Sequence, residues 1–88
     1  MSRTTLIENR LRESFAPLKI EIRDDSHRHA GHEGAKSGGG HFAVTIVSAN
    51  FQGKSPVQRH QMIYQALSDM MKKEIHALSI QAFAPDEL

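Results

Sequence analysis

The sequence contains no cysteine among its 88 residues, and this absence removes several classes of protein at once. A disulfide framework, a zinc ribbon and a thiol nucleophile all require cysteine, as does an iron–sulfur cluster held by the cysteines of one chain. The stability of the chain must therefore come from packing. Hydrophobic residues make up 39% of the sequence and charged residues 24%, which is typical of a single small globular domain over residues 1–88.

The chain also lacks an excess of one charge and a long apolar run. Eleven Lys and Arg oppose ten Asp and Glu, so the net charge of +1 gives no strong field to attract nucleic acid or an anionic membrane. No segment approaches the roughly 18 apolar residues of a membrane span. The first 15 residues lack the apolar block of a secretory signal. We therefore expect a cytoplasmic protein with no membrane contact.

Two segments carry apolar residues at helical spacing. The first helix is expected over residues 3–15, and Pro17 ends it because proline has no amide hydrogen. The second is expected to begin at Pro56 with Ser55 as its N-cap, and to close at Lys72 and Lys73. The apolar stripe of the first helix consists of Leu6, Ile7, Leu11 and Phe15, and that of the second of His60, Ile63, Ala66, Leu67, Met70 and Met71.

Three segments are predicted to form strands. Residues 18–25 alternate, with Leu18, Ile20 and Ile22 on the apolar face, whereas residues 41–49 are apolar on both faces and should be central in the sheet. The third strand is expected over residues 75–83. The order is α–β–β–α–β. This order predicts an α+β fold in which a three-stranded sheet carries both helices on one face.

The connection between the first two strands, residues 26–40, has an unusual composition. It holds five of the six glycines and three of the six histidines, namely His27, His29 and His32, while its only hydrophobic residues are two alanines. Such a segment cannot form a packed element, and a connection this long in a small domain is usually functional or mobile. Histidines at this spacing can also chelate copper, nickel or zinc.

One string of residues is specific enough to indicate a family. It reads Phe51-x-Gly53-x-Ser55-x-Val57-x-Arg59-His60 and continues through Met62, Ile63 and Tyr64. Further matches are Arg23-Asp24-Asp25-Ser26, His41-Phe42 and His76-Ala77-Leu78. With these motifs the chain resembles the BolA-like family over nearly its whole length.

The resemblance implies a fold like a type II KH domain and a partnership with monothiol glutaredoxins. The two proteins would share a [2Fe–2S] cluster, for which the glutaredoxin and its bound glutathione supply thiolates. The BolA-like chain supplies a histidine at the Arg-His position, here His60, and a second ligand from the loop between the first two strands. That second ligand is implied to be His29, ahead of His27 and His32. The resemblance thus implies a non-enzymatic adaptor in iron–sulfur trafficking or iron regulation, a monomer or weak homodimer without its partner.

The residue types agree with this implication. A chain without cysteine cannot hold a cluster alone, so thiolates must come from a partner, and imidazole is a competent ligand for iron. Each histidine also has an ordinary interpretation. His60 would be a half-buried helix residue and His29 a solvated loop residue. We expect His41 to be structural, and His76 to be semi-buried and hydrogen-bonded.

A second interpretation is DNA binding and regulation of transcription. Gly53 and Lys54 lie where a KH domain places its backbone-clamping loop, and Arg59 adds a cation. The near-neutral charge predicts weak binding by a single copy. No enzyme is expected, because Ser55 and His60 lie on different faces of one helix and no carboxylate is placed to orient the histidine.

Overall fold

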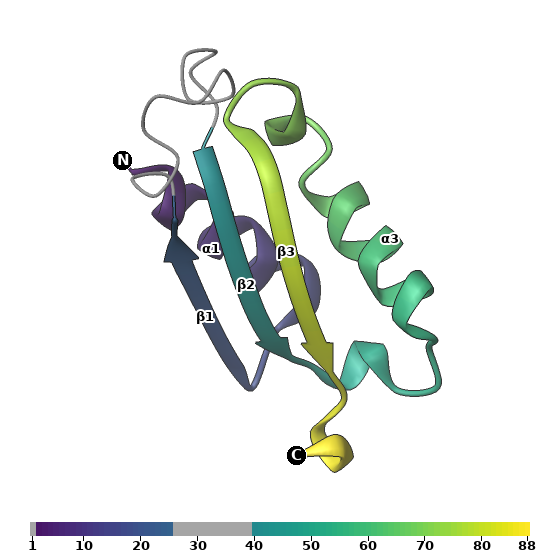
Figure 1. Ribbon diagram of the computed structural model, residues 1–88. Coiled ribbons are helices and arrows are strands. Elements are labelled where there is room, and N and C mark those ends of the chain that lie inside the picture. Colours follow the sequence, from purple (N-terminus) through teal and green to yellow (C-terminus); the bar gives the residue numbers. More distant parts are fainter. Residues whose placement is uncertain (1, 26–39) are drawn as a thin grey trace.

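The computed structural model describes residues 2–25 and 40–88 (Figure 1). These residues form the predicted α+β fold with the predicted order of elements. The helices are α1 (Arg3–Phe15) and α3 (Pro56–Ala66), and the strands are β1 (Lys19–Asp24), β2 (Gly40–Val47) and β3 (Ile75–Phe83). Short 3-10 helices occupy Ala49–Phe51, Met70–Lys72 and Pro85–Glu87.

The sheet has the order β1-β2-β3, which confirms that the second strand is central. β1 runs antiparallel to β2 with Asp24 opposite Phe42, while β2 runs parallel to β3 with His41 opposite Ala77. The last residues of β1 and the first residues of β2 and β3 therefore lie at one end of the sheet. The pairing of β2 with β3 is irregular between Gly40 and His41.

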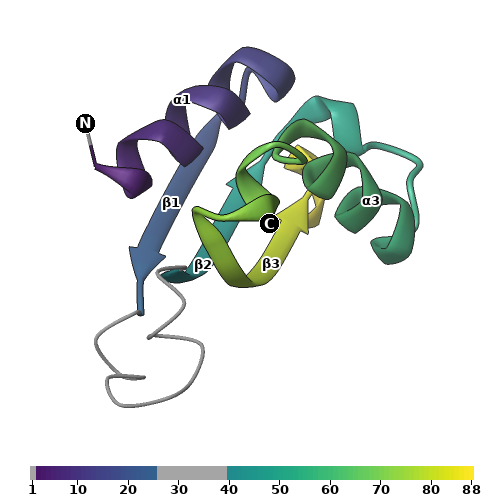
Figure 2. The ribbon, with the colours of Figure 1, turned by 90° about the horizontal axis from the view of Figure 1, so that it is seen from above.

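Both helices cover the same face of the sheet, as predicted (Figure 2). The buried core between them includes Phe51, whose ring centroid lies 5.1 Å from that of Phe15. The remaining buried members of this core are Ile7, Leu11, Phe42, Val44, Ile46, Ile63, Leu67, Met70 and Ile75. The opposite face of the sheet carries no helix within the described part of the chain (Figure 1).

The second helix is shorter than predicted, because α3 ends at Ala66 and not at Lys73. Arg10 of α1 donates from Nη1 to the carbonyl of Ala66 at 3.0 Å, and it also binds the carboxylate of Asp69 at 2.6 Å. These bonds satisfy an end carbonyl of α3 and hold the turn that follows it. Met70 still reaches the core from the next 3-10 helix.

Two hydrophobic residues assigned to the apolar faces are exposed. Leu18 precedes β1 and is 74% exposed, so the prediction that it faces the core is wrong. The chain turns immediately before it, where Ala16 adopts a left-handed conformation with φ 43° and is followed by Pro17. Leu6 is also exposed, at the border of the buried stripe of α1.

Ser55 is the N-cap of α3, as predicted. Its Oγ accepts the N–H of Gln58 at 3.2 Å, and Gln58 Oε1 accepts the N–H of Ser55 at 2.8 Å. We expect Ser55→Ala to lower the free energy of unfolding by about 1 kcal/mol, since one helix N–H loses its partner. Urea unfolding monitored by circular dichroism measures this change. Ser68→Ala, at an exposed site beyond the helix, is the matched control and should have little effect.

Within residues 2–25 and 40–88, no helix has both the length and the apolar character that a bilayer crossing requires.

Candidate metal centre

The two ends of the histidine-bearing segment are anchored at one end of the sheet. Asp25 donates its N–H to the carbonyl of His41 at 2.7 Å, and Gly40 donates its N–H to the carbonyl of Glu74 at 3.1 Å. His27, His29 and His32, three of the predicted ligand candidates, lie between these anchors and outside the described residues. Any ligand from this segment therefore comes from a stretch whose two ends join the sheet beside His41.

Two other histidines meet at this same end. The rings of His41 on β2 and His76 on β3 lie 5.0 Å apart, centroid to centroid, with their planes tilted by 46°. His76 is exposed, so the prediction of a semi-buried residue is wrong. His41 is half-buried, and its Nε2 is shielded from solvent. A second protein could therefore reach the His76 ring, while His41 packs beside it.

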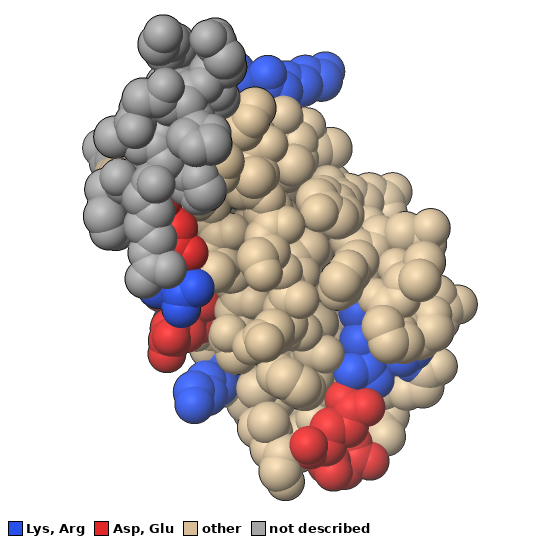
Figure 3. All heavy atoms as spheres, viewed as in Figure 1, with Lys and Arg blue, Asp and Glu red and all other residues tan. Residues whose placement is uncertain are grey.

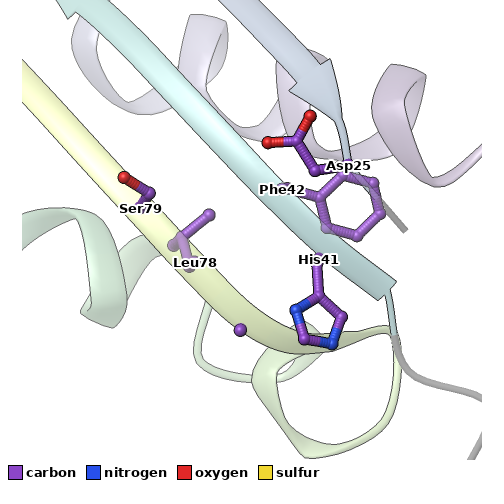
Figure 4. Close-up of a pocket in the computed structure, with 6 residues that line it drawn as sticks. Asp25, His41, Phe42, Leu78 and Ser79 are labelled. Carbon is purple, nitrogen blue, oxygen red and sulfur yellow. The ribbon is translucent and has the colours of Figure 1, made fainter. Parts of the chain in front are cut away.

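A pocket of about 220 Å³ adjoins this pair (Figure 4). It is lined by Asp25, His41, Phe42, Ala77, Leu78 and Ser79. The carboxylate of Asp25 accepts hydrogen bonds from Arg23, at 2.8 Å from Nε and 3.1 Å from the second terminal nitrogen. This bond raises the pKa of Arg23 above its ordinary value. The negative charge of Asp25 at the pocket is thus balanced by the positive charge of Arg23.

His60 lies away from this pair. α3 begins at the end of the sheet opposite to the anchors of residues 26–39, and His60 belongs to its first turns (Figure 1). The prediction that His60 shares the inward stripe with Ile63 is wrong, because its side chain is exposed and Arg59 is buried in its place. Among the described residues, no ring contact or hydrogen bond joins His60 to His41 or His76.

Arg59 is fixed inside the molecule. Its guanidinium binds the Glu87 carboxylate at 2.6 and 3.0 Å and also donates to the carbonyls of Lys54 and Ala82. Nearby, Gln52 donates to Asp86 at 3.1 Å, so the last 3-10 helix is held against the turn before α3. Of the three residues proposed for nucleic acid, Gly53 and Lys54 are exposed, whereas Arg59 is already engaged by a carboxylate.

The Arg59–Glu87 ion pair makes the stability of the fold depend on pH. The hydrogen bond from Arg59 lowers the pKa of Glu87 below its ordinary value of 4.5, and the Ala84 N–H contributes in the same direction. A carboxyl with a lowered folded pKa stabilises the fold above its unfolded pKa, and loses that contribution as the pH falls through the folded pKa. Glu87→Gln should therefore lower the melting temperature at pH 7.

The same ion pair predicts how the difference in melting temperature between wild type and Glu87→Gln changes with pH. Because glutamine does not titrate, the melting temperatures of wild type and Glu87→Gln should converge as the pH falls below about 4. Scanning calorimetry from pH 7 to pH 3 measures both curves. A constant difference at every pH would show that the ion pair does not contribute through its charge.

The described residues do not form a complete metal site by themselves. No group of three or more His, Asp or Glu side chains suited to one metal ion occurs within residues 2–25 and 40–88. The His41–His76 pair offers two imidazoles, and the adjoining segment holds three more in its sequence. A chain with this set could supply two nitrogen ligands to a metal centre but not the thiolates that a [2Fe–2S] cluster also needs.

Comparison with known sequences assigns the family. A sequence model described as BolA-like protein matches residues 11–87. The chain belongs to the BolA-like family. The DNA-binding transcriptional regulator BolA of Haemophilus influenzae is 40% identical over 87 residues, covering 99% of this chain and 82% of that protein. SufE-like protein 1 of Arabidopsis thaliana is 42% identical, but the BolA-like chain spans only 25% of its length.

Solved BolA-like structures agree with the fold. The BolA domain of SufE1 from Arabidopsis thaliana has a TM-score of 0.88 and 43% identity, covering 100% of this chain and 98% of that one. BolA1 of Mus musculus has a TM-score of 0.78 and 38% identity, covering 96% and 66% of the two chains. Curated mouse BolA-like protein 1 is longer, and this chain spans 56% of it.

Proposed function

We propose that this BolA-like protein is a non-enzymatic adaptor that binds a monothiol glutaredoxin and shares a bridging [2Fe–2S] cluster with it. Its role would be iron–sulfur trafficking or iron regulation. The observation that carries the proposal is the His41–His76 pair, which lies where the segment containing His27, His29 and His32 is anchored. The exposed imidazole of His76 thus lies at this end of a protein that has no thiol.

The donor set fits such a cluster. A [2Fe–2S] cluster needs four protein or thiol ligands, and two histidines can replace two thiolates on one of its irons. This chain would supply the two imidazoles, and glutaredoxin with glutathione would supply the two thiolates. Histidine ligation raises the reduction potential of such a cluster relative to thiolate ligation alone.

For the first ligand we favour His76 over His60. The His76 ring is exposed and lies close to the anchors of the loop, whereas His60 lies on α3, which begins at the far end of the sheet. His41 would act as a positioning residue, because its half-buried ring packs against that of His76. The second ligand would be His29 of the loop, with His27 and His32 as alternatives.

The proposal is tested by reconstitution. The purified chain is mixed with a glutathione-loaded monothiol glutaredoxin, iron and sulfide, and the mixture is passed over a sizing column. We expect one heterodimer that carries iron, sulfide and a visible circular dichroism spectrum distinct from that of the glutaredoxin homodimer. A spectrum identical to that of glutaredoxin alone, with no complex on the column, would contradict the proposal.

DNA binding is the second candidate, favoured by the name of the Haemophilus relative. The exposed Lys54 follows Gly53, whose φ of 74° forms an open turn before α3. Figure 3 shows one face of the molecule, and its centre carries no charged side chain. With a net charge of only +1, a single copy should bind DNA weakly and with a shallow dependence on salt concentration. The measurement is the electrophoretic retardation of a DNA duplex by the protein. If Lys54→Glu retards the duplex as wild type does, the turn at Gly53 and Lys54 does not bind DNA.

A further inference from the structure

Strand β1 forms one margin of the sheet. β2 is its neighbour on one side, and no described helix or strand lies beside it on the other (Figure 1). α1 lies over the face of the sheet (Figure 2). A strand in this position presents main-chain N–H and C=O groups that a further strand can pair with.

The register shows which main-chain groups point outward. Asp25 bonds through its N–H to His41, which continues the pairing of Asp24 with Phe42. Hydrogen-bonded and non-hydrogen-bonded partners alternate along antiparallel strands. Glu21 and Arg23 therefore direct their main-chain groups toward β2, while Ile20 and Ile22 direct theirs toward the margin away from β2.

We propose that β1 pairs with β1 of a second copy of this chain, antiparallel and about a two-fold axis at Ile22. The two three-stranded sheets would then form one six-stranded sheet. This register aligns residues 20–24 of both copies and lets Ile22 exchange both main-chain hydrogen bonds with its symmetry mate. It places Glu21 of each copy directly opposite Arg23 of the other.

The charges of the opposed side chains and the number of aligned residues favour this register over the neighbouring ones. The outward groups belong to even-numbered residues, so the register of a symmetric pairing can only change by two residues, which moves the two-fold axis by one residue. An axis at Glu21 would oppose Glu21 to itself and Lys19 to Arg23, which are like charges. An axis at Ile20 would align only residues 19–21 of the strand. The axis at Ile22 combines five aligned residues with two pairs of opposite charge.

The side chains at this margin are available for the contact. Glu21 and Arg23 are exposed, and the bonds of Arg23 to Asp25 use Nε and one terminal nitrogen. The other terminal nitrogen of Arg23, Nη1, can meet Glu21 of the other copy. The margin lies across the sheet from β3, so the dimer leaves His76 accessible. The inference therefore goes beyond the proposed adaptor function and does not depend on it.

The test is sedimentation equilibrium over protein concentrations from about 10 µM to about 1 mM. Wild type is compared with Glu21→Arg, Arg23→Glu, the double exchange, and Lys54→Glu as a control with a distant charge change. We expect a concentration-dependent dimer whose dissociation constant rises about tenfold or more in each single variant. The double exchange restores the opposite charges and should restore the dimer, and Lys54→Glu should behave as wild type.

Three results would overturn the inference. They are a wild-type chain that is monomeric at every concentration, single variants that dimerise as wild type does, and a double exchange that stays as weak as the singles. Far-ultraviolet circular dichroism of each variant confirms that it remains folded, so that a weaker dimer reflects the interface.

Discussion

In a complex with glutaredoxin, His76→Ala should lose most of the bridging cluster, while His60→Ala should retain it. The reason is geometric, because His76 lies with His41 at the anchors of the histidine-bearing segment and His60 lies on a helix that begins at the opposite end of the sheet. Bound iron and the visible circular dichroism spectrum measure the result. His41→Ala should weaken the cluster less than His76→Ala, because it removes a neighbour and not a ligand.

Complex formation separates this loss from a folding defect. Without iron, the His76→Ala variant should still bind glutaredoxin on a sizing column, because exposed His76 supports no part of the buried core. His29→Ala tests the loop ligand in the same way. Loss of the cluster in His60→Ala together with its retention in His76→Ala would restore the ligand assignment implied by the sequence resemblance and reject ours.

Phe51→Ala should remove a large share of the free energy of unfolding. Phe51 is fully buried, and its ring packs against that of Phe15, which ties the turn before α3 to α1. Removing a buried phenylalanine costs about 3–5 kcal/mol, because apolar contacts are lost and a cavity remains. A chain of this size has a free energy of unfolding of about 4–13 kcal/mol, so this loss is a large share. Urea unfolding at 25 °C measures it.

Val57→Ala is the matched control for Phe51→Ala. Val57 also lies near the start of α3 but is 65% exposed, so its truncation should change the free energy of unfolding by less than about 0.5 kcal/mol. Equal effects of the two variants would show that the core does not depend on the Phe51–Phe15 contact.

Local sequence patterns predicted most of the fold because they report directly on burial and capping. The run of apolar residues in β2 indicated a central strand, and Ser55 with Pro56 marked the start of α3. The end of α3 was missed because it depends on a contact distant in sequence. Arg10 of α1 binds the Ala66 carbonyl and Asp69, and no pattern within residues 56–73 encodes that contact.

The candidate site was less predictable, because its residues come together only through strand pairing. His41 and His76 are each near the start of a strand, and the parallel alignment of β2 with β3 places them side by side. The two strand starts were visible in the sequence and could have indicated this pair. The orientation of Arg59 was harder to foresee, because its buried position depends on the Glu87 carboxylate 28 residues away.

The central claim, that histidines of this chain ligate the cluster, is tested most directly by pulsed electron paramagnetic resonance of the reduced complex. The chain is labelled with ¹⁵N and the glutaredoxin and glutathione are left unlabelled. The account predicts strong ¹⁵N couplings from two imidazoles in the wild-type complex and in His60→Ala, and loss of most of the cluster signal in His76→Ala. A reduced cluster with no strong ¹⁵N coupling would contradict it.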